Sequence, residues 1–471
     1  MNKMKEIKLY RILPQLIILF FVAEIVQGES IFKESFSCDN WDKARKIERQ
    51  VIVPEFSDKV FDIEKYGAVG DGKTKNTKAI NTAIRECSSK GGGVVLVPAG
   101  IFMTGAIHFD NNVKLNISKG GKLLFSSNPK DYLPVVETSW EGIRCWNYSP
   151  LIYAHGKKNI AITGEGELDG GATAENWWSW IPLQRKDNAR PLLDRYNASR
   201  TPLKERIMGE GKYLRPHFIQ FYKCKNVLIE GVTIKDSPFW IIHPLMSENI
   251  TVRGVNLISH GPNTDGCDPE SCNGVVIENC IFNTGDDCIA LKSGRNEDGR
   301  ALGKPIENVV IKGCNMKDGH GGIVMGSEVS GGVKNIYAED CKMNSPHLGR
   351  AVRIKTSSQR GGVIEDVHIR NIEVGEVSGA VIRINCEYGK PGKYFPLVHD
   401  VYISGIKAQK ANYGILMRGL SGNSCIEDIH ISDCQFNGTK IPVKIEYAKR
   451  IELKDVYVNG KKLSGEFSET K

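Results

Sequence analysis

Beyond its first residues the sequence contains no long apolar run, so no segment after residue 28 resembles a membrane span. The apolar stretch from Leu13 to Val22 follows several basic residues and is too short to cross a bilayer comfortably. A plausible cleavage point ends at Gly28. We therefore expect residues 1–28 to be a cleaved secretory signal rather than an uncleaved anchor. This predicts a protein secreted to the extracellular space, the cell wall or the periplasm, with no membrane partner after cleavage.

The sequence also lacks a run of lysine and arginine interleaved with aromatic residues, which argues against nucleic acid as a partner. The formal net charge is +8. A modest positive balance suits a polyanionic substrate, although lysine usage alone would explain it equally well.

Glycine is plentiful, with 49 residues, which favours many turns between short strands. From residue 158 onward one pattern recurs: a polar residue, Asn or Asp, then Val or Ile, any residue, and Ile. Successive repeats begin about 22–34 residues apart, after one longer gap that holds an insertion. The repeats begin at Lys158, Lys225, Glu248, Asn273 (a looser match), Glu307, Lys334, Glu365, His399, Glu427 and Lys449.

Apolar residues alternate with polar ones within each repeat, which indicates strands with one inward face. Two short strands per repeat, no helical period and loops of changing length predict a stacked coil. A propeller is the main competitor, but its blades need about 40 residues and four antiparallel strands. We therefore predict an all-β parallel β-helix of about ten coils.

An N-terminal helix should cover the open end of this coil. Asn76 or Thr77 can cap a helix that carries Ala79, Ile80 and Ala83 on one face. Such a helix would shield apolar side chains and unpaired strand edges. We assign residues 29–56 to an N-terminal extension and residues 57–471 to a single β-helix domain.

The 13 cysteines show no zinc-binding spacing. In an exported protein they would normally suggest disulfides with one thiol left over. Several of them, however, occupy the eighth position of the repeat, where Val and Ile alternate with Cys, which predicts a buried aliphatic slot. Cys267 and Cys272 lie outside that slot and are the better disulfide candidates, with partners that the sequence does not identify.

Four polar motifs follow their strands at a similar phase on four successive coils. Similar phase on a stacked coil means the same side of the molecule, so the set should span roughly 15 Å along one face. The motifs are Asn263-Thr264-Asp265, Gly285-Asp286-Asp287, Gly319-His320-Gly321 and Arg353-Ile354-Lys355.

Three carboxylates, one imidazole and two cations in one groove are costly for folding, and crowding should raise the pKa of one acid. Such clusters occur at acid–base catalytic sites more often than on a polar surface without a function. The sequence therefore predicts a catalytic groove here.

These motifs, in this order, resemble those of the polygalacturonase family of glycoside hydrolases, which degrade pectin on a right-handed parallel β-helix. The resemblance covers most of the chain after the signal and implies inverting hydrolysis of α-1,4-linked galacturonic acid in polygalacturonate. It implies that Asp286 is the general acid and that Asp265 and Asp287 activate water from the other side, a division that fits inversion, in which acid and base stand far enough apart to admit a water. His320 resembles the residue that hydrogen-bonds the acid.

The same resemblance implies that Arg353 and Lys355 grip a substrate carboxylate, a task suited to a guanidinium fork. Asn263 is expected to line the groove. No metal and no cofactor are implied, and we expect a monomer.

Two long loops bear on whether the enzyme cuts chain ends or chain middles. The insertion between residues 159 and 226 holds three tryptophans, and a second loop runs from Gly294 to Pro305 with Arg295 and Arg300. Loops at the ends of a groove would close it into a pocket, and nearby stretches are similar to those of exo-acting members. We therefore favour exo action. The tryptophans either stack on sugars or pack the loop itself.

Three other activities compete with this prediction. The same fold serves hydrolysis of rhamnogalacturonan or substituted galacturonan, although Arg353 with Lys355 favours a uronate. A pectate lyase would need calcium and a basic catalyst, and no calcium cage is evident. A non-catalytic pectin-binding protein should lack at least one of the three acids, all of which are present.

Overall fold

The computed structural model describes residues 41–186, 189–422 and 425–469. Contacts between residues divide the chain into two units, Met1–Arg45 and Lys46–Lys471. Helix α2 (Trp41–Gln50) contains residues of both units. The predicted signal at residues 1–28 and most of the predicted extension lie outside the described residues. Within the described ranges, no helix combines the length and apolar character needed to cross a bilayer.

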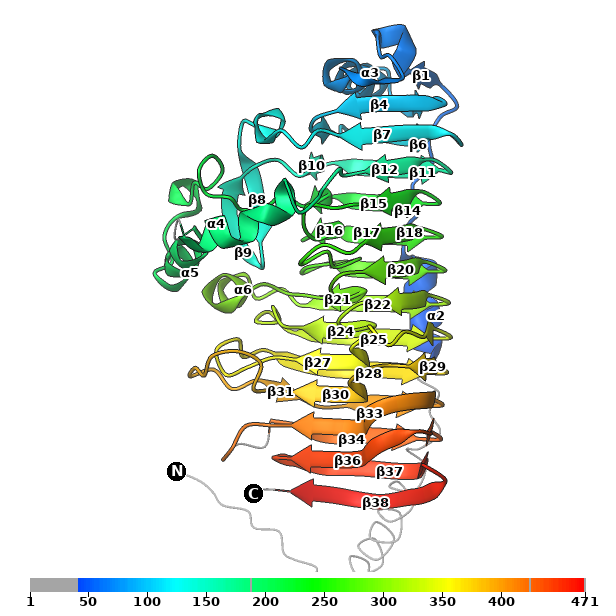
Figure 1. Cartoon of the computed structure of the whole chain (residues 1–471), viewed down its shortest axis with the longest axis vertical. Coiled ribbons are helices and arrows are strands. Elements are labelled where there is room, and N and C mark those ends of the chain that lie inside the picture. Colours follow the sequence, from blue (N-terminus) through cyan, green and yellow to red (C-terminus); the bar gives the residue numbers. More distant parts are fainter. Residues whose placement is uncertain (1–40, 187–188, 423–424, 470–471) are drawn as a thin grey trace, which may run out of the picture. The chain divides into compact units, whose positions relative to one another are not determined.

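From Val60 onward, most of the described residues form coils of short strands that stack in parallel register, the right-handed parallel β-helix that the repeat and the resemblance predicted (Figure 1). Three ladders of strands run along the stack. The first ladder contains β1 (Val60–Asp62), β3 (Gly93–Val97), β6 (Val113–Ile117), β11 (Lys158–Gly164), β14 (Lys225–Glu230), β17 (Glu248–Arg253), β19 (Asn273–Glu278), β22 (Ile306–Lys312), β25 (Val333–Glu339), β28 (Val363–Arg370), β31 (Leu397–Val398), β32 (Val401–Ser404), β34 (Glu427–Ser432) and β37 (Ala448–Val458).

The second ladder contains β2 (Asp71–Lys75), β4 (Gly100–Thr104), β7 (Gly121–Phe125), β12 (Glu167–Asp169), β15 (Thr233–Lys235), β18 (Asn256–Ser259), β20 (Ile281–Thr284), β23 (Asn315–Asp318), β26 (Lys342–Met343), β29 (Glu373–Glu376), the start of β33 (Lys407–Arg418) and β35 (Gln435–Phe436). The third ladder contains β5 (Ile107–His108), β10 (Ile152–His155), β13 (Ile219–Tyr222), β16 (Ile242–Leu245), β21 (Ile289–Leu291), β24 (Ile323–Gly326), β27 (Arg350–Lys355), β30 (Ala380–Asn385), the end of β33 and β36 (Thr439–Glu446). Isolated bridges of Cys267 to Ile242 and to Ile289 join its two halves.

The second position of each repeat forms the corner of a coil, and it is Asn or Asp in every repeat except those with Gly274 and Arg450. Asn159, Asn226 and Asn249 have φ angles of 54°, 59° and 54°, in the left-handed region that Asn and Asp tolerate better than other side chains. Their amides also bond from coil to coil: Asn226 Nδ2 donates to Asn159 Oδ1 at 2.8 Å, and Asn249 Nδ2 donates to Asn226 Oδ1 at 2.9 Å. The repeat is recognisable in the sequence because the corner residue must tolerate a positive φ and because its side chain bonds to the next coil.

The inward faces of the three ladders make one apolar core. The prediction for the cysteine slot is confirmed, since Cys280, Cys314 and Cys341 are buried among Val, Ile and Leu. The disulfide prediction for Cys267 and Cys272 is wrong: both are free, fully buried thiols. Both face the core, where Cys267 continues the inward row of Ile242 and Ile289.

The predicted N-terminal helix is α3 (Thr77–Ser89), and it buries Ala79, Ile80 and Ala83 against the first coils. Asn76 is its N-cap residue but makes no side-chain cap bond. Its amide instead binds the backbone of Val69, which fastens the preceding turn. Between β1 and β2, the chain makes the short 3₁₀ helix η1 (Ile63–Tyr66).

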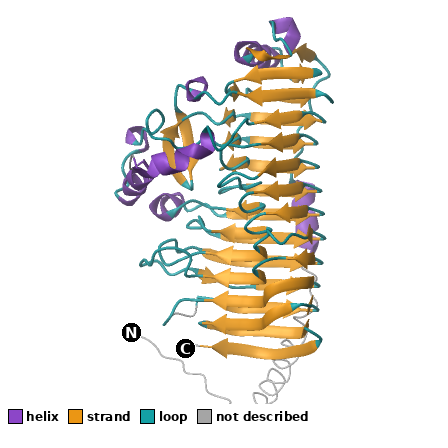
Figure 2. Ribbon diagram, viewed as in Figure 1, coloured by secondary structure: helices purple, strands orange, loops and turns teal. Residues whose placement is uncertain are grey.

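Most of the remaining helices and one hairpin lie beside the third ladder rather than in the coils (Figure 2). The hairpin pairs β8 (Val136–Trp140) with β9 (Ile143–Asn147) in antiparallel fashion, and β38 (Lys461–Glu469) pairs antiparallel with β37. The other helical elements are η2 (Pro129–Tyr132), η3 (Trp177–Ser179), α4 (Trp180–Lys186), α5 (Ala189–Ala198), η4 (Leu203–Glu205) and α6 (Asn296–Leu302).

The tryptophans of the insertion pack the protein rather than an open surface. Trp177 and Trp180 are buried with ring centroids 4.7 Å apart, and Trp177 also meets Tyr132 edge-on at 5.5 Å. Trp178 donates from its indole nitrogen to the carbonyl of Ser237 at 3.0 Å. Of the two predicted roles for these tryptophans, the packing of the loop is the one that the contacts support.

Candidate active site

The predicted site residues lie where the chain passes from the second ladder to the third. Asp286 and Asp287 follow β20, His320 follows β23, and Arg353 and Lys355 lie on β27. These positions repeat along the stack because the coils have a common phase. The turn beside His320 is tightly packed: a Cβ on Gly321 would come within 2.6 Å of Val324 Cγ2 and 3.1 Å of Asp287 Oδ1.

The structure brings all seven predicted residues together. One oxygen each of Asp265, Asp286 and Asp287 lies within 4.8 Å of the other two. Two of these acids, Asp265 and Asp286, border a cavity of about 830 Å³, here called the main pocket. Its lining includes the predicted Asn263, Asp265, Asp286, His320 and Lys355, together with Glu141, Arg190, Asp194, Arg195, Ala198, Trp240, Lys292, Arg295, Asn296, Ser327, Glu328, Gln359, Arg360, Tyr388, Gly389 and Lys390.

Asp287 lies beneath the pocket in a buried ion-pair network. Lys355 Nζ is 2.6 Å from its Oδ2 and Arg353 Nη1 is 3.2 Å from its Oδ1, and the Asp287 side chain is fully buried. Burial alone would raise the pKa of Asp287, but Lys355 and Arg353 outweigh it and lower that pKa. Asp287 is therefore a carboxylate at neutral pH.

Asp265 is in the opposite situation. Burial, then the nearby charge of Asp268 and of Asp286, raise its pKa well above the usual aspartate value. One acid of the cluster thus has the raised pKa that was predicted, with burial as the largest cause and the neighbouring acids adding to it. Its Oδ1 has no hydrogen-bond partner among the described residues, and Lys292 Nζ is 3.9 Å from its Oδ2.

Asp286 faces the pocket and is partly exposed, unlike the other two acids. His320 Nδ1 is 2.9 Å from its Oδ1, and this hydrogen bond, against some burial, raises the pKa of His320. The His320 side chain is itself exposed, so the pair can meet a molecule that enters the pocket. The backbone N–H of Asp287 also donates to Asp286 Oδ1 at 3.0 Å, which fixes the carboxylate.

Asn263 has a positive φ of 56° and is held by a buried arginine. Arg215 Nη2 donates to Asn263 Oδ1 at 2.8 Å, and Arg215 Nη1 donates to the carbonyls of Pro238 and Pro262. Asn263 therefore lines the pocket in a position that Arg215 fixes.

A second charged network, which no sequence motif indicated, lies beside the acids. Lys292 is almost fully buried and lies 3.5 Å from Asp268 Oδ2, 3.3 Å from Glu328 Oε2 and 4.2 Å from the centroid of the Trp240 ring. Lys292 and Glu328 follow strands of the third ladder, but neither belongs to a motif that stands out in the sequence. Their spacing on neighbouring coils was the available signal.

Asp268 is a buried acid that takes up a proton when the protein folds at neutral pH, which costs stability. Burial raises its pKa to about 8, although Lys292 acts in the other direction. A raised carboxyl pKa favours the folded state fully below the unfolded value of about 3.8, and this contribution is lost as pH rises towards 8. We expect Asp268→Asn to increase the free energy of unfolding at pH 7 by on the order of 2 kcal/mol, with no difference below about pH 4. Urea unfolding at both pH values measures this.

The control for that experiment is Asp58→Asn, which changes an exposed acid and should leave stability within about 0.5 kcal/mol of wild type. A less stable Asp268→Asn protein at pH 7 would show that Lys292 requires the Asp268 carboxylate.

The walls of the main pocket come from the two long loops. Glu141, at the tip of the β8–β9 hairpin, accepts from Arg190 of α5 at 2.7 Å and from Arg295 at 2.8 Å. Arg295 also pairs with Asp194 at 3.2 Å. Hairpin, insertion and the 294–305 loop are therefore joined by one carboxylate. Arg300 lies outside the lining and donates to the carbonyls of Gln359 and Arg360.

The three clustered aspartates are the group of acids whose geometry among the described residues would suit a cation. Asp287 already has Lys355 and Arg353 as partners, so much of the negative charge that would attract a metal ion is neutralised by the protein. The chemistry of the site is that of carboxylates and an imidazole beside buried cations.

Comparison with known proteins agrees with this geometry. The family model described as "Glycosyl hydrolases family 28" matches residues 201–452, which include every predicted site residue, and a model described as "Rhamnogalacturonase A/epimerase, pectate lyase-like" matches residues 60–116. The chain is 29% identical to a probable polygalacturonase of Vitis vinifera over 78% of this chain and 73% of that protein. It is 26% identical to an exo-poly-alpha-D-galacturonosidase of Dickeya chrysanthemi over 81% of this chain and 67% of that protein.

Among solved structures, a hyperthermoactive exopolygalacturonase from Thermotoga maritima superimposes with a TM-score of 0.87 at 40% identity, covering 90% of this chain and 98% of that chain. The family model spans more than half of the sequence, and the structural agreement extends over nearly the whole of it. The chain therefore belongs to glycosyl hydrolases family 28.

Proposed function

We propose that this enzyme hydrolyses the α-1,4-galacturonosyl linkages of polygalacturonate from the chain end, as a secreted protein. The observation that carries the proposal is the placement of Asp265, Asp286 and His320 in a pocket whose walls are rich in cations, with the third clustered aspartate buried beneath it. A galacturonate unit carries one carboxylate, and such pockets attract anions electrostatically. Relatives with this architecture are named as polygalacturonases and exopolygalacturonases.

The roles follow from exposure and protonation. Asp286 reaches the pocket and is hydrogen-bonded to His320, so it is placed to donate a proton to the leaving oxygen. Asp265, with its raised pKa, is a stronger base than an ordinary aspartate whenever it is ionised, which suits it to take a proton from water. Asp287 assists as a permanent negative charge beneath the reacting centre.

Lys355 lines the pocket while it also pairs with Asp287, so one ammonium group can bind a substrate carboxylate without losing its internal partner. Arg353 and Lys355 both lie near the Tyr388 ring, at 5.3 and 5.2 Å from its centroid. Tyr388 also lines the pocket and offers a flat apolar face to a sugar.

The walls of the main pocket support the exo mode. α5, the hairpin tip and the 294–305 loop meet through Glu141 at one end of the aspartate cluster, and residues of all three line the same cavity. A long polymer chain cannot pass through a wall of this kind, whereas a chain end can enter the pocket.

The stereochemistry of the proposal is inversion, which rests on the family resemblance. Inverting enzymes hold acid and base roughly 6.5–9.5 Å apart and retaining enzymes roughly 5–5.5 Å apart. The nearest oxygens of the aspartates, within 4.8 Å, lie closer than an inverting pair usually does. Inversion of an α-linkage releases the β-anomer first, and proton NMR of the first product tests this.

Product analysis on unesterified polygalacturonate tests the function and the exo mode together. We expect monomer or dimer as the products while the solution viscosity falls slowly. Mixed oligomers with a rapid loss of viscosity would show cleavage within chains. If polygalacturonate releases nothing and rhamnogalacturonan is cleaved, the substrate assignment is wrong while hydrolysis by this pocket stands. Secretion is tested by sequencing the N-terminus of the exported protein, which should begin near residue 29.

A further inference from the structure

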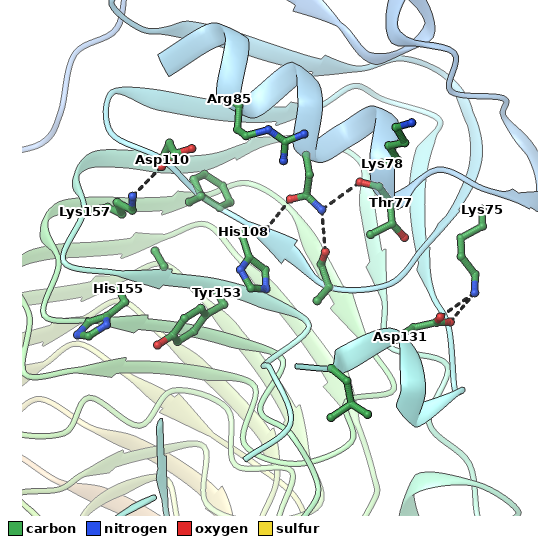
Figure 3. Close-up of a pocket in the computed structure, with 15 residues that line it drawn as sticks. Lys75, Thr77, Lys78, Arg85, His108, Asp110, Asp131, Tyr153, His155 and Lys157 are labelled. Atoms are coloured by element: carbon green, nitrogen blue, oxygen red, sulfur yellow. Dashed lines mark hydrogen bonds and ion pairs between the residues drawn. The ribbon is translucent and has the colours of Figure 1, made fainter. Parts of the chain in front are cut away.

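A second cavity lies on the same face of the third ladder as the main pocket. It has a volume of about 760 Å³ and is here called the N-terminal pocket. Figure 3 shows Arg85 and Lys78 on helix α3 beside strand residues His108, Tyr153 and His155. Its lining comprises Lys75, Thr77, Lys78, Asn81, Arg85, Ala106, His108, Phe109, Asp110, Asp131, Leu133, Tyr153, Ala154, His155 and Lys157.

The register of the third ladder connects the two cavities. His155 pairs with Tyr222, Tyr222 with Leu245, and bridges continue from Leu245 to Glu270 and from Glu270 to Lys292. His155 lines the N-terminal pocket and Lys292 lines the main pocket, so one outward row of side chains runs from the first cavity to the second.

The β8–β9 hairpin covers the middle of this row. Tyr222 donates to Glu137 Oε1 at 2.7 Å, and Thr138 of the hairpin donates to Gln220 Oε1 at 2.7 Å. Gln220 is fully buried. The hairpin thus separates the N-terminal pocket from the main pocket, and a chain end bound in the main pocket does not extend into the N-terminal pocket along this face.

The N-terminal pocket has an excess of positive charge. Its two acids are both engaged, since Lys157 Nζ is 2.6 Å from Asp110 and Lys75 Nζ is 2.7 Å from Asp131. Lys78 and Arg85 remain as cations without an acidic partner among the described residues, and the bond of the Arg85 guanidinium is to Thr82 Oγ1 at 2.9 Å. Both side chains are exposed and lie seven residues apart on the pocket side of α3.

The floor of the pocket is neutral and partly aromatic. Burial lowers the pKa of both His108 and His155, so neither imidazole adds charge at neutral pH. His155 stacks on Tyr222 at 4.6 Å, and His108 meets Tyr153 edge-on at 5.6 Å. Flat rings on the floor with cations on the wall form a surface that matches a sugar acid, which has an apolar ring face and a carboxylate.

We propose that the N-terminal pocket binds a segment of acidic polysaccharide other than the chain end that is being cleaved. The ligand class rests on the proposed function. Lys78 and Arg85 would bind uronate carboxylates from helix α3 while the ring residues of the floor lie against the sugar. Such a site would anchor the enzyme on its polymer and raise the local concentration of chain ends at the main pocket.

The test is a calorimetric titration of a galacturonate hexamer into the Asp286→Asn protein, which should not consume the ligand. We expect two hexamers to bind per chain. Adding Lys78→Ala and Arg85→Ala should weaken one of the two sites by about tenfold, since each exposed ion pair contributes roughly 0.2–1 kcal/mol. Lys119→Ala, which removes an exposed lysine outside both pockets, should leave both sites unchanged.

The same double substitution, made in the active enzyme, distinguishes a failure of the N-terminal site from a failure of the proposed function. We expect kcat on a galacturonate trimer to stay at the wild-type value, while KM for long polygalacturonate rises several-fold because anchoring is lost. The N-terminal site would be disproved if only one hexamer bound per chain. It would also be disproved if the double substitution left the affinity of both sites unchanged, even if polygalacturonate is hydrolysed. If the intact enzyme fails to hydrolyse polygalacturonate but the double substitution still removes one of two sites, the N-terminal site stands and the proposed function falls.

Discussion

Replacing Asp286 by asparagine is expected to lower kcat on polygalacturonate by about 10³-fold or more, because the asparagine amide cannot donate a proton to the leaving oxygen. The substitution keeps the shape of the side chain, and asparagine can still accept hydrogen bonds from His320 and from the N–H of Asp287. The melting temperature should therefore stay within a few degrees of the wild-type value. Initial rates of reducing-sugar release, measured beside a thermal unfolding curve, provide both quantities.

A matched control for Asp286→Asn is Asp318→Asn, which changes an acid at the end of the neighbouring strand β23 outside the main pocket. Its activity should remain near wild type. Retained activity of the Asp286→Asn enzyme would remove Asp286 from the acid role and leave Asp265, with its raised pKa, as the proton donor.

Replacing Lys355 by methionine is expected to destabilise the fold by about 3–5 kcal/mol at pH 7, because it leaves the buried charge of Asp287 with Arg353 alone. Asp287 has a lowered pKa in the folded protein, so its ion pairs add stability above the unfolded value of about 3.8. That contribution is lost as pH falls through the lowered pKa. The gap between variant and wild type should therefore close in acid, which denaturant unfolding at pH 7 and pH 3 would show.

Lys334→Met serves as the control for Lys355→Met. Lys334 pairs with Glu365 at 3.3 Å on the exposed side of β25, and its loss should cost no more than about 1 kcal/mol. If Lys355→Met is as mild as Lys334→Met at pH 7, then Arg353 alone satisfies Asp287 and the network is redundant.

The fold could be predicted from the sequence because its determinants are local and repeated. The corner of each coil has a positive φ, which Asn or Asp provides in most repeats, and each strand alternates inward and outward residues. A pattern that is repeated along the chain can be recognised in the sequence without knowledge of long-range contacts. The position of the predicted site residues followed from the same regularity, since equal phase in the repeat places them on one side of the stack.

What the sequence did not reveal depends on contacts between distant segments. Arg295 pairs with Glu141, which lies 154 residues away in the sequence, and no local sequence pattern predicts that pair. Lys292 could be placed beside Asp268 only once the third ladder had aligned their coils. Cys267 was mistaken for a disulfide candidate because its coil departs from the regular repeat, so its inward direction became visible only in the register with Ile242 and Ile289.

The role of Glu141 in the pocket wall has an evolutionary consequence. Three segments that arise from different parts of the chain meet at this one carboxylate, through Arg190 and Arg295. A single substitution there can loosen the wall without altering any coil. Related enzymes could therefore pass between cutting the ends and cutting the middles of a polymer by small steps at a loop contact, while the stacked frame and its aspartates remain under separate selection.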